Sequence, residues 1–126
     1  MSHIGPDERP PLWVGHVSMR TPVLEETAAF MEQIGMRKVT CGDDIAILEL
    51  RGGTHLALMQ DTSGEPGEAR FDLMVEDVDV TWARFKELGV PLTAIERGRI
   101  HDAFVITEPG GNTIVVNSSH VTELPV

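Results

Sequence analysis

The sequence predicts an α+β fold in which two βαβββ modules follow one another in a single chain. Three observations support this prediction. The two halves share a pattern of apolar and glycine residues, each half predicts one amphipathic helix among short strands, and 126 residues suffice for two small modules around one core. A chain of this size buries roughly two-thirds of the surface that its unfolded form exposes, so it needs no covalent or metal cross-links.

The internal repeat appears when segment 16–36 is aligned with segment 70–90. Identical residues then meet at three positions: Thr27 with Thr81, Ala29 with Ala83, and Gly35 with Gly89. Further along, Gly52-Gly53-Thr54 aligns with Gly110-Gly111-Asn112 at a slightly larger offset, which a longer hairpin in the second half explains. The repeat therefore rests on pattern and order, since few residues are identical.

The first module is expected to span residues 13–60 and to open with a short alternating strand at 14–19. Thr21-Pro22 then begins a helix, because Thr is a good cap and Pro suits the first helical position. Gly35 ends this helix in a left-handed conformation. Three further strands are expected, at 37–41, 45–50 and 54–60, separated by turns that contain glycine.

The second module is expected to span residues 70–118, after a linker at 61–69 that is rich in Gly, Ser, Glu and Pro. Asp77 or Asp79 caps its helix, and Gly89 ends it. The strands of this module are expected at 70–75, 91–96, 100–107 and 113–118. Residues 1–12 form a flexible N-terminal segment and residues 119–126 a tail.

Charge and composition exclude several function classes. The chain has 20 acidic against 10 basic residues and a net charge of −10, which argues against binding to nucleic acid or to an anionic membrane surface. Its single cysteine, Cys41, excludes an internal disulfide framework. No apolar stretch is long enough to span a bilayer, and the N-terminus is not a signal peptide. We expect a cytoplasmic protein whose partner is a small molecule.

Four landmarks arrive in order along the chain: Gly15–Met19 in the first strand, Gly35 after the first helix, Val75–Asp79 before the second helix, and Glu108–Ile114 before the last strand. Together they resemble the vicinal oxygen chelate superfamily, which includes glyoxalase I, bleomycin-resistance proteins and extradiol dioxygenases. The last landmark stands where members often read Asp-Pro-x-Gly-Asn. The resemblance implies a glyoxalase/bleomycin resistance-like fold, whose mixed sheets curl into one cup, and a homodimer that covers free strand edges.

The resemblance also implies four metal-ligand positions, which in this chain are His16, Ala57, Arg70 and Val115. Only the histidine can bind a metal, because Ala and Val lack donor atoms and a guanidinium is a permanent cation. We therefore expect no cofactor. The alternative is a divalent metal held by relocated ligands, since residues two apart share a strand face. The candidates for this relocated site are His16, His55, Asp72 and His101.

Ligand-binding candidates lie at these positions and at their neighbours on the same strand faces: His16, Ser18, His55, Arg70, Asp72, His101, Phe104, Val115 and Asn117. Arg70 either holds an anionic group of the ligand or forms a salt bridge with Asp72. Phe104 fits both a stacking surface for a ligand and the core.

Three functions fit these residues. The first is a metal-free protein that binds a small molecule in a pocket of mixed polarity, as the resistance proteins do. The second is a metal-dependent lyase or dioxygenase with relocated ligands. The third is a metal-free enzyme in which His16 or Asp72 transfers a proton. The missing chelators favour the first function.

Overall fold

The computed structural model of this protein describes residues 7–126, so the first six residues of the predicted N-terminal segment lie outside the described residues. Its elements are β1 (His16–Thr21), α1 (Leu24–Ile34), β2 (Arg37–Cys41), β3 (Ile45–Glu49), the short 3-10 turn η1 (Arg51–Gly53), β4 (His55–Gln60), β5 (Leu73–Val75), α2 (Val78–Glu87), β6 (Ala103–Thr107) and β7 (Thr113–Ser118). Neither described helix is long and apolar enough to cross a membrane.

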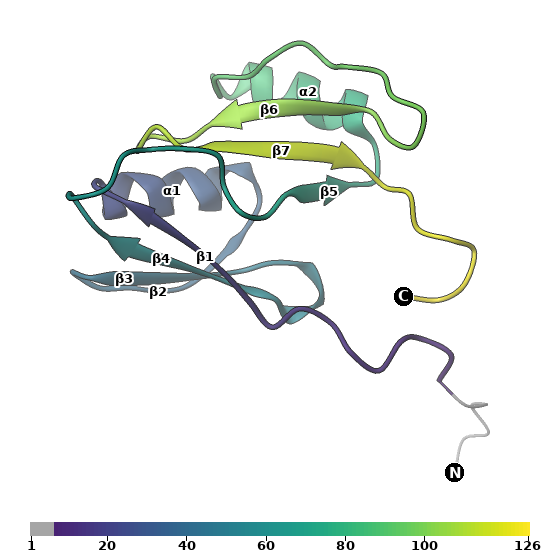
Figure 1. Ribbon diagram of the computed structural model, residues 1–126, viewed down its shortest axis with the longest axis horizontal. Coiled ribbons are helices and arrows are strands. Elements are labelled where there is room, and N and C mark those ends of the chain that lie inside the picture. The colour runs from purple at the N-terminus through teal and green to yellow at the C-terminus, as the bar shows by residue number, and fades with distance from the viewer. Residues whose placement is uncertain (1–6) are drawn as a thin grey trace.

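The strands form two mixed sheets that lie next to one another (Figure 1). The strand order is β1-β4-β3-β2 in the first sheet and β5-β7-β6 in the second. In each sheet the first strand of the module runs parallel to its last strand, and the remaining pairs are antiparallel. The common plan confirms the predicted α+β fold of two related modules.

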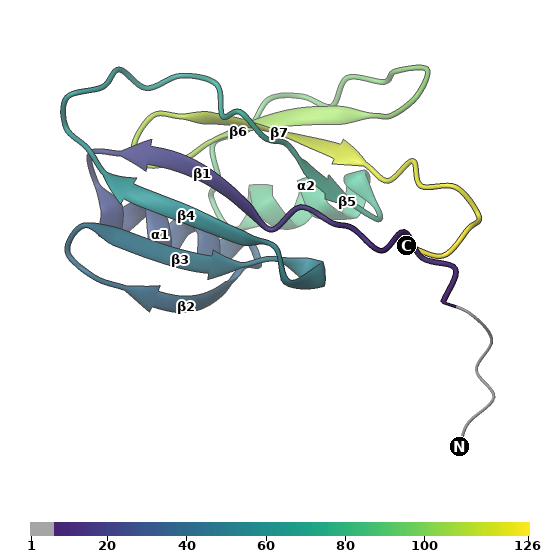
Figure 2. The same cartoon turned by 60° about the horizontal axis from the view of Figure 1, so that its bottom comes forward.

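Strand alternation separates a core face from an open face on each sheet. Leu48 of β3 and Leu56 of β4 are fully buried on the side of α1, and Phe104 of β6 meets Phe85 of α2 edge-on, with ring centroids 6.0 Å apart. The opposite faces carry no helix, and Figure 2 shows both helices behind the sheets. We call these helix-free surfaces the first and second open faces.

The open faces contain most of the residues that the sequence nominates for function. The first open face carries Arg37, Glu49, His16, Ser18, Arg20, His55, Ala57 and Met59. The second carries Met74, Ala103, Val105, Val115 and Asn117. Arg70 and Asp72 precede its first strand, because β5 begins at Leu73 and not at residue 70 as predicted. Both sets follow from the register, because residues two apart along a strand point to the same side.

The start of α1 differs from the prediction. The helix begins at Leu24 with Val23 as its N-cap, so Pro22 is not its first residue and Thr21 is not its cap. The Thr21 hydroxyl instead accepts a hydrogen bond from the Val23 amide, and Gln60 of β4 accepts one from the Leu24 amide. A side chain from a distant strand thus satisfies the free N–H group that the prediction assigned to a local cap.

The cap of α2 is confirmed. The Asp77 carboxylate accepts a hydrogen bond of 3.0 Å from the Val80 amide. The predicted helix ends are also confirmed, because Gly35 and Gly89 have φ angles of 133° and 81°, which L-residues with a Cβ rarely adopt.

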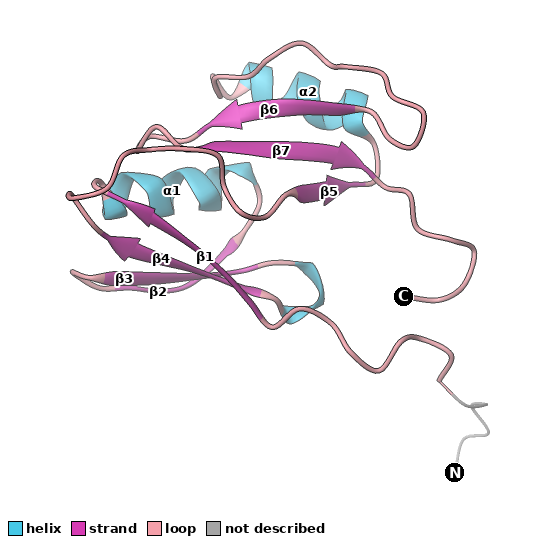
Figure 3. Cartoon of the chain, viewed as in Figure 1, coloured by secondary structure: helices cyan, strands magenta, loops and turns pink. Residues whose placement is uncertain are grey.

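The predicted strand at 91–96 is wrong, and Figure 3 shows this stretch as a loop between α2 and β6. It pairs with β6 only through two isolated bridges, Leu92 with Ile106 and Glu96 with Ala103. The register shifts by one residue between them, and the Val105 amide donates to the hydroxyl of Thr93 instead of a backbone carbonyl. An extra residue of this kind is a bulge, which interrupts a regular ladder.

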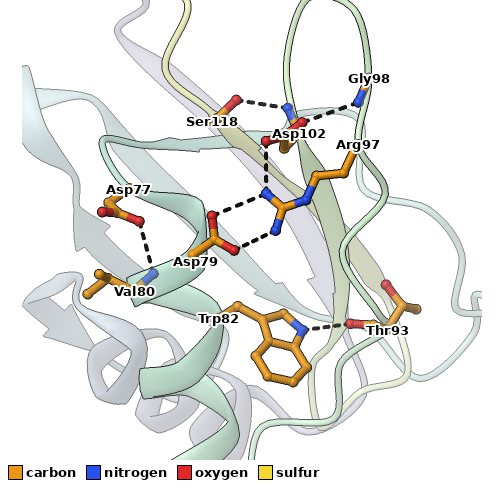
Figure 4. Close-up of polar contacts among 9 residues, drawn as sticks. All are labelled: Asp77, Asp79, Val80, Trp82, Thr93, Arg97, Gly98, Asp102 and Ser118. Atoms are coloured by element: carbon orange, nitrogen blue, oxygen red, sulfur yellow. Dashed lines mark hydrogen bonds and ion pairs between the residues drawn. The ribbon is translucent and has the colours of Figure 1, made fainter.

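Arg97 holds this irregular stretch against α2 (Figure 4). Its guanidinium donates to both carboxylate oxygens of Asp79, at 2.6 and 3.1 Å, and to Asp102 at 2.9 Å. Hydrogen bonding to Arg97 lowers the pKa of Asp79, and the two carboxylates raise the pKa of Arg97. Trp82 adds a bond from its indole N–H to the carbonyl of Thr93 at 2.8 Å. These side-chain contacts therefore hold the stretch between α2 and β6 in place, where the predicted strand would have used backbone hydrogen bonds.

The two modules meet at a buried polar cluster around Glu108, which is 2% exposed. One carboxyl oxygen accepts from the Thr27 hydroxyl at 2.7 Å and from the Gly110 amide at 2.8 Å. The other accepts from the backbone and side-chain N–H groups of Asn112 at 3.0 and 2.9 Å. Asn112 also donates to the carbonyl of Arg20 at 2.8 Å. These bonds fix the turn between β6 and β7 against β1 and α1.

Replacing Glu108 by Gln should destabilise the protein by about 1–3 kcal/mol, because each carboxyl oxygen faces N–H donors and an amide NH2 group must oppose at least one of them. Urea unfolding followed by circular dichroism measures the loss. Glu87→Gln on the exposed side of α2 is the matched control and should change stability little. Equal effects of the two substitutions would contradict the structural role of Glu108.

Replacing Arg97 by Met should loosen the stretch between α2 and β6 with little global cost. The Arg97 side chain is 57% exposed, and exposed ion pairs contribute little to global stability. Hydrogen exchange at the Glu96 and Gly98 amides should accelerate, because both lie in the segment that Arg97 ties down. Unchanged exchange, relative to an Arg99→Met control, would contradict this account.

Candidate functional site

Four side chains form a row across the first open face. The register places His16 of β1 opposite His55 of β4, His55 opposite Glu49 of β3, and Glu49 opposite Arg37 of β2. Residues that face one another on neighbouring strands lie within side-chain contact distance. The row thus extends across all four strands of the sheet.

Glu49 connects this row. One of its carboxylate oxygens lies 3.0 Å from Nε2 of His55 and the other 2.7 Å from Nη2 of Arg37. The hydrogen bond with His55 and the interaction with Arg37 lower the pKa of Glu49. The His55 ring in turn meets the exposed ring of His16 edge-on, with centroids 5.8 Å apart. The Glu49 carboxylate therefore orients the imidazole of His55, and the exposed imidazole of His16 lies next to it.

The second open face contains a pair of polar groups at the junction of β5 and β7. Asn117 is 5% exposed and donates its side-chain N–H to the carboxylate of Asp72. Its carbonyl Oδ1 is buried and has no hydrogen-bond partner among the described residues. Asp72 itself is exposed, and Val115 lies beside it on β7. Asp72 therefore presents an exposed acceptor, whereas the Oδ1 of Asn117 is inaccessible in this structure.

A cleft of about 490 Å³ joins the two faces along the linker. Ser18 reaches it from the first face and Arg70 from the bend between the linker and β5. Arg20, which also lines the cleft, is held by Asp61 at 3.0 Å. Arg70 forms no ion pair with Asp72 or with any other described residue, so the predicted salt bridge is not formed. Its guanidinium is available to an anionic group.

Two of the candidate residues lie elsewhere. Phe104 is 1% exposed and packs in the core beneath α2, so its ring does not reach the open face. His101 precedes β6, which starts at Ala103 and not at residue 100 as predicted. The His101 ring lies beside the ring of His120, with centroids 5.6 Å apart. This pair marks the end of the second open face that lies near the tail.

The four metal positions that the resemblance implies do not fit a metal. His16 and Ala57 lie on adjacent strands of the first open face, Val115 lies on the second, and Arg70 precedes β5. Three of these side chains provide no metal-binding atom. The relocated set is brought together only at His16 and His55. Within residues 7–126, no three side chains of His, Cys, Asp or Glu are placed to share one ion.

Glu49 and Arg37 are not among the residues that the sequence predicts for the site. A signal for Glu49 exists in the sequence, because Glu49 and His55 stand at equal distances from the turn at Arg51–Gly53. A hairpin with that centre pairs the two residues directly. Arg37 carries no comparable signal, since its partner depends on the bulge that shifts the register between Lys38 and Thr40 of β2.

The family of the chain follows from its match over residues 13–116 to the model of the Glyoxalase/Bleomycin resistance protein/Dioxygenase superfamily. Because this match covers most of the sequence, the chain belongs to that superfamily. The expected family is thereby confirmed. No curated protein matches the chain.

Solved structures of related fold include three with different activities. A lactoylglutathione lyase from Agrobacterium tumefaciens superposes with a TM-score of 0.74 at 20% identity, over 89% of this chain and 97% of its own. The antibiotic-binding protein TnmS3 from Streptomyces sp. CB03234 gives 0.72 at 22% identity, covering 85% and 95%. The bleomycin resistance determinant encoded on transposon Tn5 gives 0.72 at 18%, covering 87% and 100%. At these identities the likeness shows the fold.

The lowered pKa of Glu49 gives a pH prediction. Because its pKa is lower in the folded than in the unfolded state, ionised Glu49 stabilises the fold above its ordinary pKa, and this contribution disappears as the pH falls through the folded value. The free energy of unfolding should therefore fall less steeply between about pH 5 and pH 3 in Glu49→Gln than in the unaltered chain. Glu32→Gln, on exposed α1 surface, serves as the control and should keep the original slope.

Proposed function

We propose that this protein binds a small organic molecule on its open faces without the divalent metal of its metal-using relatives. The observation that carries the proposal is the identity of the residues at the expected metal positions, where Ala57, Arg70 and Val115 provide no ligand atom. A site that has lost its chelators but kept a histidine, a serine and a free arginine retains groups that recognise a ligand.

The cleft that joins the two faces supports a ligand with an anionic group. Its volume of about 490 Å³ lies within the range of small-molecule sites. The unpaired guanidinium of Arg70 binds a carboxylate or phosphate through two parallel hydrogen bonds, and the Ser18 hydroxyl adds a donor. His16 and His55 extend the polar surface towards the first face, and Val115 provides apolar contact on the second.

The relatives support binding as the function. TnmS3 is an antibiotic-binding protein and the Tn5 protein is a bleomycin resistance determinant, whereas the Agrobacterium protein is a lyase. The same fold therefore serves both binding and catalysis, and the residues on the open faces decide between them. In this chain they favour binding of an intact molecule over turnover.

We also propose that two copies of the chain associate and cover the open faces. Apolar side chains are exposed there, including Ile45 at 44% and Met74 at 50% exposure. A second copy would bury these residues and close the cup around the ligand. Sedimentation equilibrium should give twice the chain mass of 13.8 kDa at micromolar concentration, and a particle of 13.8 kDa would contradict this proposal.

The alternative is a metal-dependent lyase or dioxygenase with relocated ligands. One observation favours it: the rings of His16 and His55 are neighbours, and two imidazoles at this spacing can contribute to one metal site. Protein purified without chelator and analysed by mass spectrometry for Fe, Mn, Ni and Zn distinguishes the two functions. We expect far less than one ion per chain. Roughly one bound ion per chain would replace the proposed function by this alternative.

Ligand binding is tested with benzoate as a simple aromatic carboxylate. Arg70→Met should weaken benzoate binding about tenfold, because a charge-assisted bidentate contact is lost. Arg51→Met removes another exposed arginine that lies outside the joining cleft, and it should leave the affinity unchanged. Isothermal titration calorimetry measures both variants. Equal affinities in the two variants would rule out Arg70 as the anion-binding group.

A further inference from the structure

The two junctions between the modules are not equivalent, although the repeat relates them. The alignment of the halves pairs Glu108 with Leu50, Asn112 with Thr54, Thr21 with Val75, and Thr27 with Thr81. At the first junction the members of this set form the buried cluster around Glu108. At the second junction, two of the matching residues are apolar, so the same cluster cannot form there.

The remaining polar groups of the second junction are used locally. The Thr81 hydroxyl donates to the carbonyl of Asp77 within its own helix, at 2.8 Å. The Thr54 hydroxyl donates to the carbonyl of Val14 ahead of β1, at 2.6 Å. Neither of these two bonds crosses from one module to the other. Among the described residues, the polar contact that does cross here is the exposed ion pair of Arg51 with Glu76, so no buried cluster like that of Glu108 fills this junction.

The second junction instead holds a cleft of about 540 Å³. Its walls come from the end of α1, the turn after β3, strand β5, helix α2 and the tail. The apolar side chains among the lining residues include Met36, Leu50, Leu73, Val75, Phe85 and Val121. The volume lies within the range of sites for drug-sized molecules, and apolar walls of this kind bind an apolar body.

An acidic side chain without an ion-pair partner among the described residues lines this cleft. Arg51 and Glu76 also line it, but they form an ion pair at 2.9 Å, so their opposite charges compensate each other. Asp72 forms no ion pair with any described residue. The neighbouring Asn117 donates to the Asp72 carboxylate and leaves its own buried Oδ1 without a partner. A carboxylate without a cationic partner favours a cationic donor and disfavours an anion.

We propose that this cleft binds an amphipathic organic amine. The protonated amine lies at the Asp72 carboxylate and the apolar body lies between Leu50 and Val75. This site is separate from the cleft that contains Arg70, and the two share no lining residue. The inference goes beyond the proposed function, because it assigns a second cavity and a ligand class of opposite charge.

The probe is n-octylamine, which is protonated at pH 7, and calorimetry measures its binding to the full chain. We expect octylammonium to bind, uncharged n-octanol to bind more weakly, and n-octanoate not to bind. Asp72→Asn should weaken octylammonium about tenfold and leave octanol unchanged. Asp43→Asn, which removes one exposed acid from the turn after β2, should leave both affinities unchanged.

A second variant tests the position of the apolar body. Leu50→Trp fills the cleft and should weaken both octylammonium and octanol, while benzoate binding at Arg70 is retained. Thermal unfolding verifies that each variant is folded. In nuclear magnetic resonance spectra, octylammonium should shift the amide signals of Val75 and Phe85 and not that of Ser18.

Three results would overturn the inference. They are no octylammonium binding to the unaltered chain, equal affinity in Asp72→Asn and Asp43→Asn, and tighter binding of octanoate than of octylammonium. Loss of benzoate binding in Arg70→Met tests the proposed function independently, so either hypothesis can fail while the other stands.

Discussion

The position of the two modules relative to one another depends on the hydrogen bonds of the buried Glu108 carboxyl group. A carboxyl group removed from water is costly unless its oxygens are hydrogen-bonded, and here the Thr27 hydroxyl and two N–H groups of Asn112 are among its donors. Because these donors come from both modules, the turn after β6 has one favoured position against α1. That position sets how the two open faces lie relative to one another and therefore where His16, Ser18 and Arg70 stand.

Within each module, strand alternation decides which residues are free for function. Residues such as Leu48 and Ile106 are fully buried beneath a helix, and their neighbours in sequence point to the open face. The helices thus cover one face of each sheet and leave the other exposed. Glu49 is an example. It pairs with His55 and Arg37 and so forms a polar row on the open face, which does not contribute to the core.

The repeat gives the chain two junctions of different character. One is filled by Glu108 and its donors, and the other, where Leu50 and Val75 replace polar residues, holds an apolar cleft beside Asp72. A duplicated fold can therefore use one copy of a junction for stability and the other for binding. The two clefts also differ in charge, because Arg70 lines one and Asp72 the other.

The order of the elements outside residues 91–96, an aspartate cap at 77 or 79, the helix ends at Gly35 and Gly89, and the missing chelators follow from the sequence alone, because each depends on local periodicity or on the chemistry of one residue. The pairing of Glu49 with Arg37, the burial of Phe104, the bulge that replaces the strand at 91–96 and the cluster at Glu108 required the tertiary structure. These features depend on register and on contacts between residues far apart in the chain. Such contacts form only when both modules have folded, so no local pattern encodes them.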